Sequence, residues 1–165
     1  EKSALCTAAA AGPCFEGANI SCGMSATSGA VYSYSEDKIK TISDAPAKGI
    51  CGTGLVDIIA YLLDKEIMDE TGYMEDDFEI AEGVSINQAD IRQYQLAKSA
   101  VCAGLLTLLD EAGLSVDKIE KIYITGSFGN NIDPISAERI GMIPGGCAAK
   151  VTADCGFAID GATQS

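Results

Sequence analysis

The stretch IYITGSFGNNIDPISAERIG, residues 122–141, joins an apolar run to a glycine-rich turn and then to the start of a helix. The Ile-Tyr-Ile run favours a β-strand. Asp133 and Pro134 fit an N-cap and the first position of a helix. Between them, Gly126 and Gly129 follow the carboxyl end of the strand, where ligands bind in open α/β sheets. The stretch therefore predicts an α/β fold with, at this point, either a ligand-binding loop or an ordinary αL turn with an exposed Phe128.

The rest of the chain predicts further elements from apolar periodicity and turn residues. They are strands at 4–11, 31–34, 39–42, 121–125 and 150–155, and helices at 55–65, 86–112 and after Pro134, with Glu36-Asp37 in a hairpin turn. Three meandering strands followed by alternating helices and strands are typical of a mixed sheet with helices on both faces. We therefore expect a five-stranded, RNase H-like α/β fold that forms a single domain over residues 1–165.

The two main helices carry apolar faces and end signals. The face expected for the first helix has 3.6-residue spacing and comprises Leu55, Ile58, Ile59, Leu62 and Leu63. For the second helix we expect a capping box of Ser85 and Gln88, and termination at Gly113. The buried face of this helix is expected to comprise Tyr94, Ala97, Val101, Gly104, Leu105, Leu108 and Ala112.

The charge of the chain excludes several classes of partner. Its net charge is −13 and it contains no His. Nucleic acids and anionic membranes attract basic surfaces, so neither is an expected partner. Without His, the chain lacks the usual general base and the usual zinc ligand. Nine acidic residues and a single Lys fall within 64–82, which we expect to be a solvated connecting face.

The cysteines do not indicate a metal site. There are seven, at positions 6, 14, 22, 51, 102, 147 and 155, and no CxxC pair occurs. Iron–sulfur and zinc sites normally show closer spacings, so we expect no metal and no cluster in this chain. Free, buried thiols in a reducing cytoplasm are the prediction.

A second glycine-marked junction precedes the helix at 55. In the run 49–54, Gly52, Thr53 and Gly54 resemble a loop whose backbone N–H groups bind a phosphate. The run is not a Walker A motif, and tight packing of helix against strand explains the glycines equally well. Glu16, between glycine-rich turns, fits either a polar site residue or a solvent-facing turn.

Four phrases, in order, carry a resemblance to a known family. They are AAAAGPCFEGANISCGMSA, KGICGTGLVDIIAYLL, INQADIRQYQLAKSAVCAGLLTLL and IYITGSFGNNIDPISAERIGMIP. Together they resemble the C-terminal domain of the ATP-dependent reductive activators of corrinoid proteins. Those activators look like members of the acetate-and-sugar-kinase, heat-shock-chaperone and actin ATPase superfamily, which pairs two RNase H-like halves around a nucleotide.

The resemblance implies a set of nucleotide-binding residues in this chain. The adenosine motif would comprise Gly126, Ser127, Phe128, Gly129 and Asn130, with Ser127 where the superfamily usually has a second Gly. Gln95, Lys98 and Ser99 match the helix that flanks adenosine in the chaperone relatives. Gly12, Glu16 and Gly17 take the place of the second phosphate loop, without its usual Asp-Gly-rich form.

The resemblance also implies a function. The whole protein is expected to use ATP and Mg²⁺ to return corrinoid Co(II) to Co(I), with a corrinoid protein of a methyltransferase system as partner and a homodimer as a possible state. The first phosphate loop, the catalytic Asp and an iron–sulfur module are expected upstream, so the chain would be a fragment that is inactive alone. Two alternatives stay open: a docking module for the corrinoid protein with little nucleotide contact, and half of a sugar or acid kinase.

Overall fold

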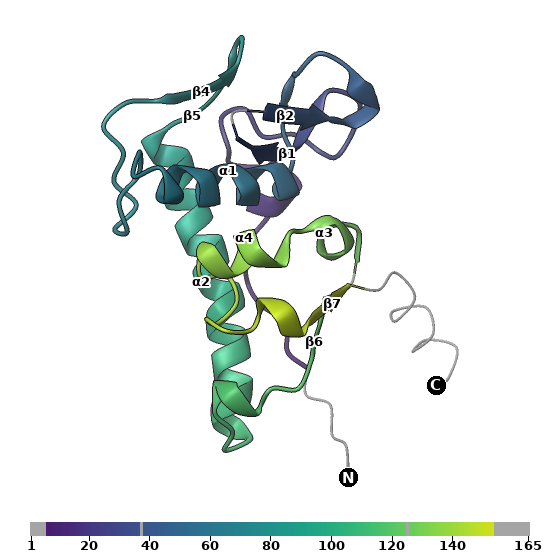
Figure 1. The fold of residues 1–165 in the computed structure, drawn as a ribbon, viewed down its shortest axis with the longest axis vertical. Helices are drawn as coiled ribbons and strands as arrows, with labels where there is room; N and C mark the ends of the chain where they lie inside the picture. The colour runs from purple at the N-terminus through teal and green to yellow at the C-terminus, as the bar shows by residue number, and fades with distance from the viewer. Residues whose placement is uncertain (1–5, 37, 125, 154–165) are drawn as a thin grey trace.

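The computed structural model describes residues 6–36, 38–124 and 126–153, and shows helices and short strands in alternation (Figure 1). The strands are β1 (Ala30–Ser35), β2 (Lys38–Thr41), β3 (Gly49–Ile50), β4 (Phe78–Ala81), β5 (Val84–Ile86), β6 (Ile122–Ile124) and β7 (Val151–Ala153). The helices are α1 (Gly52–Asp64), α2 (Gln88–Glu111), α3 (Gly126–Asn131) and α4 (Pro134–Arg139). The mixed α/β class predicted from the sequence is confirmed.

The described strands form three separate sheets, so the prediction of one five-stranded mixed sheet is wrong for this part of the chain. The first sheet has the order β2-β1-β3, with β1 antiparallel to β2 and parallel to β3. The second is the antiparallel pair β4-β5, and the third is the parallel pair β6-β7. Figure 1 shows the three sheets in different parts of the molecule, with α1, α2 and α4 among them.

The predicted strand at 4–11 accounts for part of this difference. Residues 6–11 form no strand, and residues 6–10 are exposed. Apart from Cys6 and Thr7 they are alanines, whose small side chains gain little from burial. Positions 4 and 5 lie outside the described residues.

The predicted hairpin is confirmed, with its first strand longer than expected and its second shifted by one residue, and the predicted C-terminal strands are confirmed with shorter described bounds. β1 and β2 pair around Glu36, which adopts a positive φ of 49° in the turn, while position 37 lies outside the described residues. β6 pairs with β7 from Ile122 opposite Val151 to Ile124 opposite Ala153. The parts of the two predicted strands at 125 and at 154–155 also lie outside the described residues.

Helix α1 confirms the predicted apolar helix but begins three residues earlier than expected. Cys51 is its N-cap, so the three residues expected to form a loop, Gly52 to Gly54, are its first turn. The helix packs against β1 and α4. Its buried residues are Gly52, Thr53, Gly54, Leu55, Val56, Ile58, Ile59, Ala60 and Leu62, which leaves Leu63 of the predicted face only partly buried.

Helix α2 is capped by Asn87 and Asp90 rather than by the predicted pair. The Asn87 side chain accepts from the Asp90 N–H, and the Asp90 carboxylate accepts from the Asn87 N–H at 3.1 Å. Gln88 instead accepts from the Met74 N–H at 2.9 Å and donates to the Gly72 carbonyl at 2.7 Å. Its side chain therefore fastens the preceding loop, a long-range role that the local pattern does not reveal.

The burial of α2 is concentrated in its first half. Tyr94 and Ala97 are buried as predicted, together with Ile91 and Asp90. The predicted residues Val101, Gly104, Leu105 and Leu108 are only partly buried, and Ala112 is exposed. Gly113 ends the helix with a φ of +62°, as predicted.

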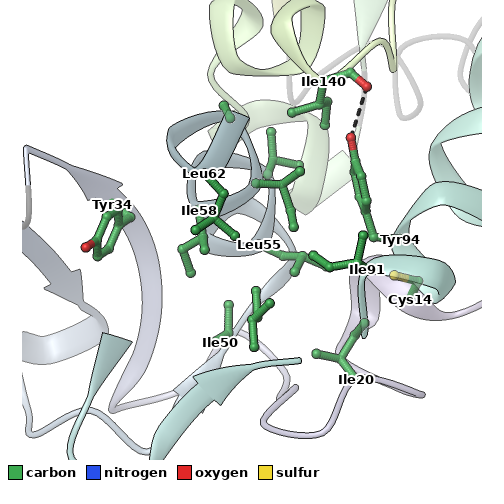
Figure 2. Packing of buried hydrophobic residues seen from close by; sticks show 14 of the residues in the cluster. Cys14, Ile20, Tyr34, Ile50, Leu55, Ile58, Leu62, Ile91, Tyr94 and Ile140 are labelled. Atoms are coloured by element: carbon green, nitrogen blue, oxygen red, sulfur yellow. Dashed lines mark hydrogen bonds between the residues drawn. The ribbon is translucent and has the colours of Figure 1, made fainter. Parts of the chain in front are cut away.

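The core lies where α1 crosses the first half of α2. Figure 2 shows Leu55 of α1 beside Ile91 of α2, and Ile58, Leu62 and Tyr94 belong to the same buried cluster. The Tyr94 hydroxyl donates to the Ile140 carbonyl at 2.9 Å, which satisfies its polar end inside the core. This bond attaches the segment after α4 to α2.

The acidic segment 64–82 is a solvated face as predicted, since its nine acidic residues are exposed, and it also contains β4 and a bridge between Met68 and Met74. The prediction that the thiols are buried needs correction. The six described cysteines are free thiols, but only Cys14, Cys51 and Cys147 are buried, and Cys6 is exposed. Within the described ranges, the helices are too short or too polar to span a membrane.

Candidate functional site

A cleft of about 740 Å³ brings together segments that are far apart in the sequence. Its lining residues are Phe15, Glu16, Met24, Ser25, Ala26, Tyr32, Ile42, Cys51, Gly52, Thr53, Phe128 and Asn131. Seven of them come from the AGPCFEGA turn, from the start of α1 with its N-cap and from α3, which are segments that the glycine pattern or the family resemblance singled out; the other five come from elsewhere in the chain. A volume of this size is typical of pockets for small molecules and cofactors.

The AGPCFEGA turn contributes Phe15 and Glu16 to the cleft from a short 3₁₀ helix, η1 (Cys14–Glu16). Gly17 ends it with a φ of +90°, and a Cβ there would lie 2.5 Å from the Met24 nitrogen. Both the torsion and the contact therefore require glycine at this point. Glu16 is exposed, and Gly12 is exposed and does not line the cleft.

The start of α1 forms the floor of the cleft. A Cβ on Gly52 would collide with the Phe15 carbonyl oxygen, and one on Gly54 with the Val31 carbonyl oxygen. Tight packing therefore accounts for these two glycines. The Thr53 hydroxyl donates to the Tyr32 carbonyl at 2.9 Å. Cys51 caps the helix without a side-chain bond to its first N–H groups, so these groups are not satisfied by the usual capping.

The third segment surrounds α3. The Phe128 ring stacks on Phe15, with 5.0 Å between ring centroids and 25° between planes, so Phe128 is partly buried rather than exposed. Gly126 has a φ of +89° and open space around the position of a Cβ. Gly129 is buried, and a Cβ there would collide with Ile124. Asn130 has a buried Oδ1 without a hydrogen-bond partner among the described residues.

The predicted helix residues lie elsewhere. Gln95 and Lys98 line a second, smaller hollow of about 150 Å³ with Arg139 and Gly141. Gln95 donates to the Thr71 carbonyl at 2.8 Å, and Ser99 is exposed. Of the predicted nucleotide residues, Glu16, Gly52, Thr53 and Phe128 line the cleft, and Gln95 and Lys98 line the smaller hollow. Neither lining includes Gly12, Gly17, Gly54, Ser99, Gly126, Gly129 or Asn130, and the roles of all these residues remain predictions.

Several cleft residues were missed by sequence reasoning. Met24, Ser25, Ala26, Tyr32 and Ile42 line the cleft from loops and from β1. No local signal marked Tyr32: strict alternation would place Tyr32 and Tyr34 on the same face, yet Tyr34 is buried and Tyr32 lines the cleft, with a register irregularity between Val31 and Ser33. The contributions of the loops depend on the tertiary fold alone.

Two ionisable groups near these segments have shifted pKa values. Burial, together with the charge of Asp90, raises the pKa of the Cys14 thiol to about 11, so this thiol stays protonated at neutral pH. Burial also raises the pKa of Asp57 on α1, although hydrogen bonds from Ser33, Tyr34 and Ser136 oppose the shift. Among the described residues, no three His, Cys, Asp or Glu side chains are grouped to hold a metal ion.

This chain is similar to proteins whose names refer to the activation or reduction of corrinoid proteins. A family model described as the C-terminal domain of RACo, the ASKHA domain, matches residues 1–165. The corrinoid activation enzyme RamQ of Eubacterium limosum is 30% identical over 82% of this chain. A [Co(II) methylated amine-specific corrinoid protein] reductase of Methanosarcina barkeri is 28% identical over 86% of it.

A solved structure agrees with these sequence matches. A reductive activator for corrinoid, iron–sulfur protein superposes on 93% of this chain with a TM-score of 0.79 and 30% identity. The chain spans 28% and 31% of the length of the two curated relatives and 29% of the solved chain. The match over all 165 residues, together with this structural likeness, means that the chain belongs to the family of RACo C-terminal ASKHA domains.

Proposed function

We propose that this chain is part of an ATP-dependent reductive activator that returns corrinoid Co(II) to Co(I), and that it supplies the adenosine side of the nucleotide cleft. Family membership and the functions for which the relatives are named support the activity. The proposal includes an RNase H-like half of an actin-like ATPase, a further ATPase half and an iron–sulfur module outside this chain, and a cytoplasmic location. A homodimer belongs to the same proposal.

The observation that carries the nucleotide role is the meeting of three glycine-marked segments in one cleft. Phe15 and Glu16, Gly52 and Thr53, and Phe128 are separated by tens of residues in the sequence, yet they line the same hollow. The segments at 49–54 and 126–129 were selected by their glycines, and the AGPCFEGA turn was selected by the family resemblance. Their convergence favours a bound nucleotide over three unrelated packing motifs.

The cleft offers different chemistry at different points. The first N–H groups of α1, behind Gly52 and Thr53, are donors at the positive end of a 13-residue helix and suit a phosphate. Glu16 is an exposed carboxylate on the opposite segment and suits Mg²⁺ or a water bound to it. Phe128, Phe15 and Tyr32 offer aromatic surface to a base.

The proposed overall reaction couples two conversions, the reduction of cobalt and the hydrolysis of ATP. One electron reduces Co(II) to Co(I), and the resemblance assigns the donor to an iron–sulfur module outside this chain. Hydrolysis of ATP by water to ADP and phosphate supplies the free energy for this uphill transfer. The chain's own residues would bind and orient the nucleotide, and no described residue is proposed as the electron carrier.

The test uses the full-length protein, because each half of such a cleft supplies only part of the contacts. Ala26 is exposed and lines the cleft, so Ala26→Trp should fill it without disturbing the core. We expect calorimetry to show at least tenfold weaker binding of Mg-ATP and the absorbance of the cognate corrinoid protein to show slower formation of Co(I). Ala103→Trp, at an exposed alanine of α2 that does not line the cleft, is the matched control.

The outcomes separate the parts of the proposal. Unchanged ATP affinity in Ala26→Trp would remove the cleft as the nucleotide site, and absence of ATP binding by the unaltered protein would remove the ATPase function. Gly126→Val is a less selective test than Ala26→Trp. The φ of +89° at Gly126 means that Val would distort the turn even without a ligand.

A docking role for the acidic segment 64–82 is a second proposal that is compatible with the first. Glu75, Asp76, Asp77, Glu79 and Glu82 are all exposed. Such a surface would attract a corrinoid protein with a basic rim, and salt would screen the attraction over about 8 Å at physiological ionic strength. Affinity of the isolated domain for the cognate corrinoid protein should fall as salt rises, and absence of binding at low and high salt would exclude this role.

A further inference from the structure

Tyr32 is a large aromatic side chain that the fold leaves open to the cleft. Its exposed fraction is 38%, whereas those of its strand neighbours Val31 and Tyr34 are 0% and 7%. β1 has a register irregularity between Val31 and Ser33, which interrupts the strict alternation of faces; Val31 and Tyr34 are buried in the core, whereas Tyr32 lines the cleft. An open aromatic ring on the wall of a cleft is the kind of surface on which a flat ligand group packs.

The backbone around Tyr32 is held in place on both sides. The Tyr32 carbonyl accepts from Thr53 Oγ1 at 2.9 Å. The Val31 carbonyl accepts from the Cys51 N–H at 3.1 Å and from Cys51 Sγ at 3.4 Å. β1 is also the middle strand of the β2-β1-β3 sheet. The ring is thus carried by a rigid element, and a ligand that packs on it loses little additional conformational entropy.

The other aromatic rings of the cleft are already paired. Phe15 and Phe128 stack on each other, so each has one face covered. Within the described part of the chain, Tyr32 stacks on no other ring, and its hydroxyl has no hydrogen-bond partner. Tyr32 therefore has both an unoccupied face and an unused polar group beside the same hollow.

We infer that Tyr32 is a specificity-determining residue whose ring stacks on the base of the nucleotide in this cleft. The inference rests on the proposed nucleotide function and adds a contact that the glycine motifs did not indicate. Stacking on a tyrosine selects for a flat aromatic ring and is indifferent to the phosphate groups. It therefore acts on the base end of the ligand, while the start of α1 is suited to the phosphate end.

The test compares three variants of the full-length protein. Tyr32→Leu keeps apolar bulk but removes the ring, and we expect its affinity for Mg-ATP and for adenosine to fall by about tenfold or more. Tyr32→Phe keeps the ring and should bind within about threefold of the unaltered protein, because stacking needs no hydroxyl. Tyr73→Leu removes a tyrosine that is 61% exposed and does not line the cleft, and should bind like the unaltered protein.

A second measurement does not depend on the folding of Tyr32→Leu. NMR spectra of protein with ¹³C-labelled tyrosine contain a ring signal from Tyr32, which is identified because it disappears in Tyr32→Phe. We expect this signal to shift when ATP binds and to stay unchanged with inorganic tripolyphosphate, which has no base. A merely structural role for Tyr32 would lower the melting temperature of Tyr32→Leu and leave the ring signal insensitive to the base.

The possible failures are distinguishable. If the unaltered protein binds no ATP, the proposed function fails and the inference fails with it. If the unaltered protein binds ATP, but Tyr32→Leu binds it equally well or the Tyr32 signal does not respond, the inference alone is overturned.

Discussion

The two glycine-marked junctions, at 49–54 and at 126–129, look alike in sequence but use glycine for different physical reasons. At the first junction, Gly52 and Gly54 leave room for the carbonyl oxygens of Phe15 and Val31. At the second, Gly126 has open space around it and a φ of +89° that other residues rarely adopt. A glycine can thus be required by a neighbouring segment or by its own torsion, and the pattern of letters does not distinguish the two.

The largest loss of stability is expected at the first junction, where glycine leaves room for a neighbouring carbonyl oxygen. Gly54→Ala places a methyl group against the Val31 carbonyl oxygen, and backbone atoms cannot move aside easily. Alanine gains about 1 kcal/mol over glycine in a helix, but the collision should outweigh this and lower the free energy of unfolding by about 3 kcal/mol. Urea denaturation measures the loss, with Gly145→Ala, which has open space and no positive φ, as the control.

A smaller loss is expected where glycine supplies the torsion. Gly126→Ala collides with nothing, but holding alanine at positive φ should lower the free energy of unfolding by about 1–2 kcal/mol. Gly126→Asn should lose less, because Asn adopts this region more readily. Gly83→Ala, at a turn with a φ of +72° and open space, is the matched control and should lose a similar amount. Equal losses for Gly54→Ala and Gly126→Ala in the same denaturation series would contradict the distinction.

The helix after the first junction also contains a carboxylate that we expect to destabilise the domain at neutral pH. Because the pKa of Asp57 is raised in the folded state, the folded protein binds the proton more tightly than the unfolded chain. Stability therefore falls as the pH rises through this raised pKa. Asp57→Asn should raise the melting temperature modestly at pH 7, and the gain should shrink as the pH is lowered. A gain that is independent of pH would show that charge is not its cause.

The smallest effect is expected for the ion pairs that join the helices after the two junctions. Arg139 of α4 contacts Asp64 at the end of α1 at 2.6 Å and Glu70 at 3.1 Å. Both carboxylates are well exposed, and exposed pairs contribute about 0–1 kcal/mol. Arg139→Gln should therefore lower the free energy of unfolding by under about 1 kcal/mol at low salt, and the difference should vanish near 1 M NaCl. A loss that persists at high salt would instead indicate that the Arg139 side chain contributes through packing.

Residue patterns over a few positions correctly predicted the helix features that are set by residues adjacent in the sequence. The apolar spacing of α1, the N-cap Asp133 with Pro134, and Gly113 at the end of α2 all appear in the structure as expected. The capping box of α2 was misplaced because two acceptable patterns overlap, one at Ser85 and Gln88 and one at Asn87 and Asp90. A contact from Ser21 decides between them, since its N–H donates to the buried Asp90 carboxylate at 2.7 Å.

By itself, the sequence determined the class of the fold, the positions of its main helices and two glycine-marked segments that line part of the cleft. These follow from periodicity, capping and torsional preferences, which act over a few residues. Only the tertiary structure decided that the described strands form three small sheets, that Gln95 and Lys98 lie in a separate hollow, and that Tyr32 faces the cleft. Such features depend on which distant segments pack together. Packing is decided by the interaction energies of the whole chain, so no short stretch of sequence predicts it.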